Sequence, residues 1–147
     1  MAIHLLSKQK TLPIRPKAMR RRLNVLMKDL GLSETELSIT ITDDREIRAI
    51  NAQYRGVDKA TNVLAFALEE GPLMPGAPRV LGDIVISADT IRREAGPLGY
   101  TDGEMLYFYL VHGLLHLIGY DHEKGPKEAA RQEAETERLW NMIRHDL

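Results

Sequence analysis

The chain has 147 residues, of which 44% are hydrophobic and 28% are charged, and its formal net charge at pH 7 is −1. This balance is typical of one globular domain, here residues 1–147, that can bury a core. The sequence lacks cysteine, which excludes disulfides and thiolate metal sites and leaves His, Asp or Glu as ligands. The most apolar stretch, residues 105–118, contains two histidines and is too short for a membrane span. With no secretory signal, we expect a cytoplasmic protein.

The first 30 residues predict a strand and a basic helix. Residues 2–6 are short and apolar, and apolar side chains recur at helical spacing over residues 17–30, before Gly31. Eight lysines and arginines stand against one aspartate in this part of the chain. The outer face of the helix carries Arg20, Arg21, Asn24 and Lys28. Such a basic segment indicates a polyanion partner, and a merely solvated helix face is an equal alternative.

The middle of the chain predicts a strand, a helix and a second strand. Strict alternation over residues 37–42 is typical of a half-buried strand. Either aspartate of the pair 43–44 can cap a helix that ends near Gly56. The continuous apolar run over residues 63–68 predicts a buried strand. Residues 71–78, with their prolines and glycines, predict a loop.

A further strand is expected over residues 80–86, where Gly82 suggests a bulge or a close approach of backbones. The helices expected after it are 90–95 (capped by Ser87 or Asp89), 105–118 (capped by Asp102) and one from Pro126 to about Arg144 (apolar at Ala130, Ala134, Leu139, Met142 and Ile143). Helix 105–118 is apolar almost all round, which predicts a buried central helix. The order of elements predicts an α+β domain, with about four strands in one mixed sheet covered by helices.

Three of the five histidines lie in the string H-G-L-L-H-L-I-G-Y-D-H, at His112, His116 and His122. The first two are four residues apart and share one helix face. Gly119 can end the helix at a positive φ and let the chain return His122 toward the pair. Three imidazoles with a fourth position open are typical of a catalytic metal site. We therefore predict one divalent metal per chain at these histidines, with zinc favoured; hydrogen-bonded core histidines are the alternative.

The spacing H-x-x-x-H-x-x-G-x-x-H also matches the metzincin proteases, which read H-E-x-x-H-x-x-G-x-x-H. Their glutamate, the general base of the reaction, is replaced here by Gly113. Glycine accepts no proton, so a peptidase mechanism lacks its central acid/base group.

The histidine string resembles the signature H-G-x-L-H-L-x-G-Y-D-H of the YbeY endoribonuclease family and matches it at every fixed position. Residues 51–64 resemble the family segment L-N-x-x-Y-R-x-x-D-x-x-T-[DN]-V-L, and residues 81–84 resemble its L-G-D-I strand. Two positions depart from the family pattern. Ala65 stands where the family usually has serine, which puts a hydroxyl contact in doubt, and Ala67 stands where it usually has proline.

The resemblance implies a metal-dependent endoribonuclease specific for single strands, with one zinc-type metal at His112, His116 and His122. Its implied roles are rRNA processing, including maturation of the 16S rRNA 3′ end, and ribosome quality control. Single-stranded RNA, rRNA and ribosomal subunits are the implied partners, with no membrane and no DNA. The match also places the family's site arginine at Arg55. A guanidinium can bind phosphoryl oxygens bidentately, which suits a catalytic role; a surface arginine at a helix end is the alternative.

The residues leave parts of the mechanism open. The metal can polarise a phosphoryl oxygen or supply hydroxide, and the RNA 2′-OH is another candidate nucleophile. Asp83 and Asp121 are candidates for supporting or proton-transfer roles, although Asp121 could instead only shape the turn. Two rival functions remain: a metal-dependent hydrolase of another substrate, such as a metzincin-like peptide hydrolase, and a non-catalytic ribosome-associated RNA-binding protein.

Overall fold

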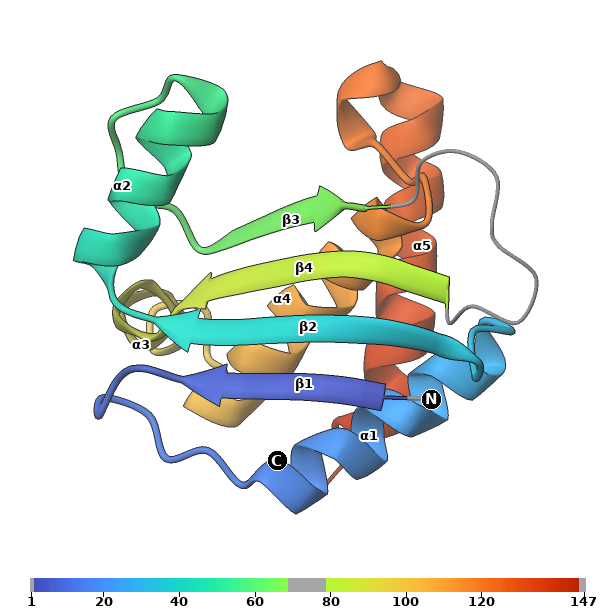
Figure 1. Ribbon diagram of the computed structural model, residues 1–147. Helices are drawn as coiled ribbons and strands as arrows, with labels where there is room; N and C mark the ends of the chain where they lie inside the picture. The colour runs from blue at the N-terminus through green and yellow to red at the C-terminus, as the bar shows by residue number, and fades with distance from the viewer. Residues whose placement is uncertain (1, 69–78, 146–147) are drawn as a thin grey trace.

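A computed structural model describes residues 2–68 and 79–145, in which four strands form one sheet (Figure 1). The strands are β1 (Ala2–Ser7), β2 (Thr35–Thr42), β3 (Val63–Ala67) and β4 (Arg79–Ser87), in the order β1-β2-β4-β3. β1 and β4 both run parallel to β2, whereas β3 runs antiparallel to β4. The predicted mixed sheet is therefore confirmed, while the loop predicted for residues 71–78 lies outside the described residues.

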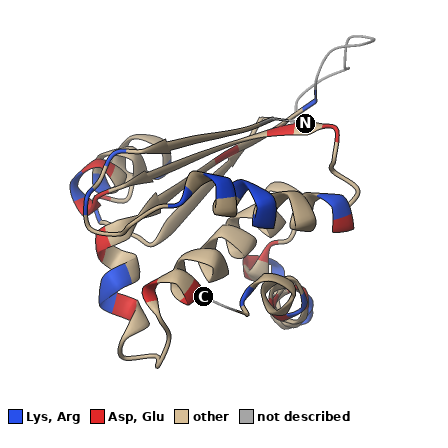
Figure 2. Ribbon diagram, turned by 90° about the horizontal axis from the view of Figure 1, so that it is seen from below, with Lys and Arg blue, Asp and Glu red and all other residues tan. Residues whose placement is uncertain are grey.

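The helices are α1 (Pro16–Asp29), α2 (Asp44–Arg55), α3 (Ala88–Ala95), α4 (Asp102–Leu117) and α5 (Pro126–Ile143), with a short 3₁₀ helix η1 (His122–Lys124). Figures 1 and 2 show that α1, α4 and α5 lie on the same face of the sheet. Leu37, Ile39 and Ile41 of β2 point into the core beneath these helices. The alternating residues of β2 remain partly exposed on the other face, as the sequence pattern predicts for a half-buried strand.

α4 is the central helix of the fold, and Leu110, Val111 and Leu114 in it are fully buried. The prediction that Asp102 caps this helix was wrong. Thr101 is the N-cap: its hydroxyl accepts from the Glu104 backbone N–H, and the Glu104 carboxylate accepts from the Thr101 N–H, both at 3.0 Å. This reciprocal pair satisfies two backbone donors at once, which Asp102 alone could not do. Within the described ranges, none of the helices has the length and apolarity that crossing a membrane requires.

β3 corrects the prediction of a fully buried strand, since it lies at the edge of the sheet and only Leu64 in it is buried. Its apolar run has another cause, because each face of the strand meets a helix. Val63 and Ala65 pack on the main core, whereas Leu64 and Phe66 join a small cluster around Ile47 of α2. An edge strand that is covered on both faces therefore has the composition of a buried one.

Gly82 shows both of the features that the sequence predicted for it. The pairing of β2 with β4 skips Leu81, so that Glu36 faces Val80 and Leu37 faces Gly82. Gly82 has a φ of +152°, and a Cβ there would collide with the carbonyl oxygen of Phe66 on β3. Only glycine lets the two strands approach this closely.

The buried stripe of α5 differs from the predicted one. Ala130 and Ala134 are exposed, and the buried positions are Gln132, Thr136, Leu139, Trp140 and Ile143. These five keep a helical spacing, but two of them are polar. The hydropathy pattern missed Gln132 and Thr136 because it assigns polar side chains to the surface.

Candidate active site

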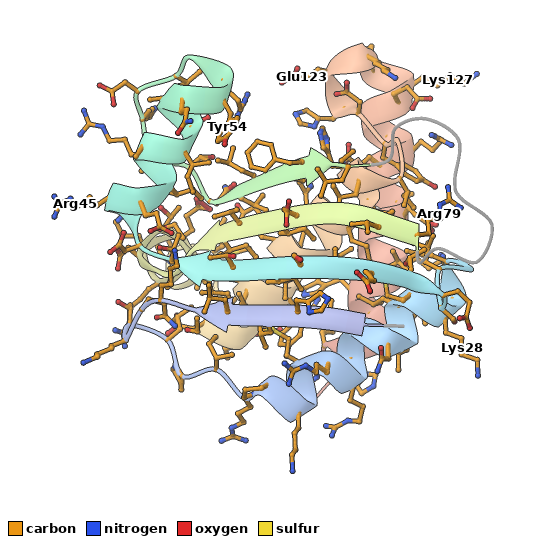
Figure 3. All side chains as sticks on the ribbon, in the orientation of Figure 1. Lys28, Arg45, Tyr54, Arg79, Glu123 and Lys127 are labelled. Carbon is orange, nitrogen blue, oxygen red and sulfur yellow. The ribbon has the colours of Figure 1, made fainter. Side chains whose placement is uncertain are left out.

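A cleft of about 390 Å³ lies where the C-terminal end of α2, strand β3, the second half of α4 and η1 meet. Its polar lining consists of Arg55, Thr61, Asn62, His112, His116, Asp121, His122 and Glu123. In the view of Figure 3, Tyr54 of α2 lies near the start of β3, and Glu123 of η1 lies near the end of that strand. The structure thus brings the three predicted histidines and Arg55 to one cleft.

The turn after α4 carries His122 back toward the helix. α4 ends at Leu117, and Gly119 follows with a φ of +106°, as the sequence predicted. Asp121 then caps η1, because its side chain accepts from the backbone N–H of Glu123 at 2.9 Å. The ring centroids of His112 and His122 lie 5.8 Å apart as a result.

His112 is the most enclosed of the three histidines, whereas His116 and His122 are exposed. Burial lowers the pKa of His112 below its ordinary value, and the positive charge of protonated His122 and His116 lowers that pKa further. The neutral imidazole is therefore favoured at His112. This is the form that can donate a lone pair to a metal.

The donor set fits a divalent transition metal. Three imidazoles without a thiolate suit zinc, and Zn–N bonds of about 2.0–2.1 Å would let two rings at the His112–His122 separation share one ion. As the side chains stand, however, no three His, Cys, Asp or Glu residues within ranges 2–68 and 79–145 are grouped closely enough to hold a metal. Metal binding by His112, His116 and His122 therefore stays a prediction.

Gly113 explains why the metzincin glutamate has no counterpart here. A Cβ on Gly113 would lie 3.1 Å from Ile84 Cγ2 and 3.3 Å from Val63 Cγ2, so this side of α4 packs tightly on the sheet. A glutamate side chain has no room at this position. The packing thus removes both the base and the space that a metzincin-like peptidase mechanism needs.

Arg55 lies in the last turn of α2 and is exposed to the cleft. Several other arginines are held by carboxylates, for example Arg93 by Asp44 at 2.7 Å and Arg138 by Asp29 at 2.8 Å. Within the described residues, Arg55 has no such ion pair. Its guanidinium is therefore available to an anion in the cleft.

The loop that connects α2 to β3 is fixed by residues of the family segment. The Asn51 side-chain amide donates to the Lys59 carbonyl oxygen at 2.8 Å, and Arg48 forms an ion pair with Asp58 at 2.8 Å. These contacts hold the loop on α2, directly after Arg55. Sequence reasoning gave neither Asn51 nor Asp58 a role, because a position in a motif does not say what the side chain contacts.

Asn62 ties the start of β3 to the helices behind the cleft. Its amide nitrogen donates to Glu94 Oε1 of α3 at 3.2 Å, and Tyr109 of α4 donates to Glu94 Oε2 at 2.6 Å. Burial raises the pKa of Tyr109, and the neighbouring Glu94 carboxylate raises it further. The Tyr109 hydroxyl therefore stays a donor, and Glu94 links the start of β3 to α4, the helix that carries His112 and His116.

Of the two candidate aspartates, Asp83 and Asp121, only Asp121 lines the cleft. Ile84 faces Gly113 of α4, so the preceding residue, Asp83, points to the opposite face of the sheet and does not line the cleft. Asp121 lines the cleft and also shapes the turn. Glu123 is a second cleft carboxylate that sequence reasoning missed, although it follows His122 directly. Ala65 lines the cleft as well, so the hydroxyl usual in the family is missing from its wall.

Known proteins are similar to this chain over nearly its whole length. The family model described as Endoribonuclease YbeY matches residues 5–144. Proteins named Endoribonuclease YbeY from Geobacter sulfurreducens and Syntrophotalea carbinolica are each 41% identical, over 144 and 146 residues; the alignments cover 97% and 99% of this chain and 96% and 97% of the relatives. The solution structure of TM1509 from Thermotoga maritima superposes with a TM-score of 0.61 at 26% identity, covering 97% of this chain and 91% of that one.

The name of the matched family indicates the class of protein, the endoribonucleases. The chain belongs to the YbeY endoribonuclease family, because the family model and the relatives cover nearly its whole length. The resemblance inferred from the histidine string is confirmed.

Proposed function

We propose that this protein is a metal-dependent endoribonuclease that cleaves single-stranded RNA. We further propose that it acts in rRNA processing, including maturation of the 16S rRNA 3′ end, and in ribosome quality control on ribosomal subunits. One observation carries the proposal: Arg55 and three histidines, from segments far apart in the sequence, line a single cleft. Membership of an endoribonuclease family supports RNA as the substrate.

The chain's own residues have distinct tasks in this proposal. Arg55 binds two oxygens of the scissile phosphate, where negative charge develops during cleavage. Asp121 and Glu123 are the carboxylates of the described lining, and Glu123 is the freer one to accept a proton, because Asp121 already caps η1. His112, His116 and His122 would hold a divalent metal, which would supply Lewis acidity at the same phosphate.

An adjoining cleft offers a path for the rest of the RNA strand. It also measures about 390 Å³, shares Arg55, Thr61 and Asn62 with the histidine cleft, and adds Lys59 to the lining. Arg93, which is paired with Asp44, and Glu94 line it as well. Cationic side chains along a groove follow a phosphate backbone without reading its sequence. An RNA strand that crosses from one cleft to the other passes over Arg55.

Tyr54 supports a preference for unpaired bases. Its side chain is 66% exposed, and its ring centroid lies 5.5 Å from that of Phe66, which lines the histidine cleft. An exposed ring beside a cationic cleft can stack on a base only when that base is free of its complementary strand.

The test is a cleavage assay with metal-quantified protein, using a labelled single-stranded RNA, the same RNA in a duplex, and a peptide of mixed sequence. We expect internal cleavage of the single strand, little cleavage of the duplex, none of the peptide, and loss of activity in His116→Ala. Peptide hydrolysis would instead favour the alternative hydrolase. RNA binding without cleavage by fully loaded protein would favour the non-catalytic RNA-binding protein.

A further inference from the structure

Gln132 of α5 is a buried polar residue that contacts a predicted metal ligand. Its side chain is 2% exposed, and its amide nitrogen lies 3.4 Å from His112 Nδ1. In this orientation the amide oxygen, Oε1, is buried and has no hydrogen-bond partner among the described residues. Leaving a buried oxygen unpaired costs about 1–3 kcal/mol, so the orientation of this amide needs a physical explanation.

A half-turn of the amide group exchanges its oxygen and its nitrogen. The two atoms have nearly the same shape and are assigned from the hydrogen bonds that they make. After the turn, Oε1 faces His112 Nδ1 and accepts a hydrogen bond from it if that nitrogen carries the proton. The amide nitrogen then takes the place of Oε1, so among the described residues His112 Nδ1 is the partner of the amide in either orientation.

The orientation of the amide also decides what His112 can bind. If the amide nitrogen donates to Nδ1, a neutral His112 carries its proton on Nε2 and has no lone pair left for the cleft. If Oε1 accepts from Nδ1–H, the lone pair is on Nε2, which points away from Gln132. Only the second arrangement lets His112 act as a ligand through Nε2.

We propose that Gln132 is a positioning residue, which holds His112 in the Nδ1–H form and directs Nε2 into the cleft. The proposal rests on the metal-dependent function above and adds a residue to it. Partners of this kind orient the histidines of metal sites and raise their basicity. Gln132 is well placed for this task because burial fixes its side chain between α4 and α5.

The chain offers three informative variants. Gln132→Met keeps a similar volume but removes the acceptor, whereas Gln132→Glu keeps an acceptor at the same place. Thr136→Val is the matched control, because Thr136 lies one turn further along α5 and is also buried. Its hydroxyl also has no hydrogen-bond partner within the part of the chain that the structure describes. It removes a buried polar group from the same helix face without changing Gln132.

The first measurement is nitrogen-15 NMR of the imidazoles in metal-free protein at a pH where His112 is neutral. We expect wild type, Gln132→Glu and Thr136→Val to hold the proton on Nδ1, and Gln132→Met to shift it toward Nε2. The second measurement is the zinc dissociation constant from competition with a chromophoric chelator. Gln132→Met should bind zinc about 10–100-fold more weakly, and Gln132→Glu and Thr136→Val should stay close to wild type.

A wild-type His112 that holds its proton on Nε2 would overturn the proposal. So would a Gln132→Met protein with unchanged tautomer and zinc affinity, or an equal loss in Thr136→Val. These outcomes are distinct from failure of the proposed function, because the tautomer is measured without metal or RNA. If wild type cleaves RNA with zinc and Gln132→Met has the same tautomer, zinc affinity and cleavage rate, the role of Gln132 is refuted. The proposed function would still stand.

Discussion

Arg55 reaches the cleft from the end of α2, and within the described residues it forms no ion pair with a carboxylate. A guanidinium that clamps the scissile phosphate should contribute most when charge develops in the transition state. We therefore expect Arg55→Ala to lower the single-turnover cleavage rate about a hundred- to a thousand-fold, by analogy with the loss of an oxyanion donor. Arg55→Lys should also be impaired, because it keeps the charge but loses the planar fork.

The Arg55 assay uses a short single-stranded RNA, with each protein at matched metal occupancy. Metal content should be unchanged in both variants, since arginine is not a ligand. Arg45→Ala serves as the control, because Arg45 is exposed on the same helix and does not line the cleft. A wild-type cleavage rate in Arg55→Ala would remove Arg55 from the chemistry.

The helix α1 carries five of the eight lysines and arginines in the first 30 residues. Figure 2 shows the lysines and arginines of α1 in blue along its ribbon. Arg20, Arg21 and Lys28 are exposed and line a shallow groove. Changing these three residues to glutamine should weaken RNA binding. The slope of log affinity against log salt concentration should become shallower by about 0.7 for each phosphate of a single strand that the variant leaves without a cationic partner. Binding isotherms at several salt concentrations measure both effects.

The same triple variant should cleave at a normal rate once RNA is saturating, because α1 does not line the histidine cleft. If RNA affinity and salt dependence both match those of wild type, the basic face is only solvated.

The β-bulge in β4 gives a prediction about stability. Gly82→Ala places a methyl group against the Phe66 carbonyl oxygen, at a φ that L-residues rarely adopt. We expect the free energy of unfolding to fall by about 2–5 kcal/mol from strain and overpacking together. Chemical denaturation measures the change. Gly96→Ala is the control, since no neighbouring atom would meet its Cβ, and equal stability of the two variants would contradict this account of the bulge.

The elements also show how far the sequence could predict the structure. β2 follows from its alternating pattern, and α4 follows from an apolar composition that extends almost all round the helix. The edge position of β3 could not follow, since strand order depends on pairing between distant segments. The burial of Gln132 and Thr136 was missed because a polar residue enters a core only where a distant partner or packing constraint accepts it.

At the site, the sequence could predict the positions of residues that lie close together along the chain. The spacing of His112, His116 and His122 lies within one helix and its turn, so the sequence alone indicates that they face one place. The contacts of Glu94 with Asn62 and Tyr109 join three separate segments, and no short motif contains them. The pairing of Gln132 with His112 is hidden for the same reason.

The fold as a whole brings distant parts of the chain to one cleft: Arg55 and His122 both line it, although they are 67 residues apart in the sequence. The central claim is that this assembled cleft cleaves RNA only when the histidines hold a metal. Its separate parts are a guanidinium, three imidazoles and two carboxylates. None of these groups would cleave RNA alone, so we expect cleavage to need all of them together with one bound ion.

The most direct measurement is a zinc titration of metal-free protein in which bound zinc and the single-turnover cleavage rate of a single-stranded RNA are followed together. We expect a cleavage rate that rises in proportion to bound zinc and levels off at one ion per chain. We also expect neither stoichiometric zinc nor cleavage in a variant with His112, His116 and His122 all changed to alanine. Full-rate cleavage by metal-free wild type, or stoichiometric zinc retained by the triple variant, would contradict the central claim.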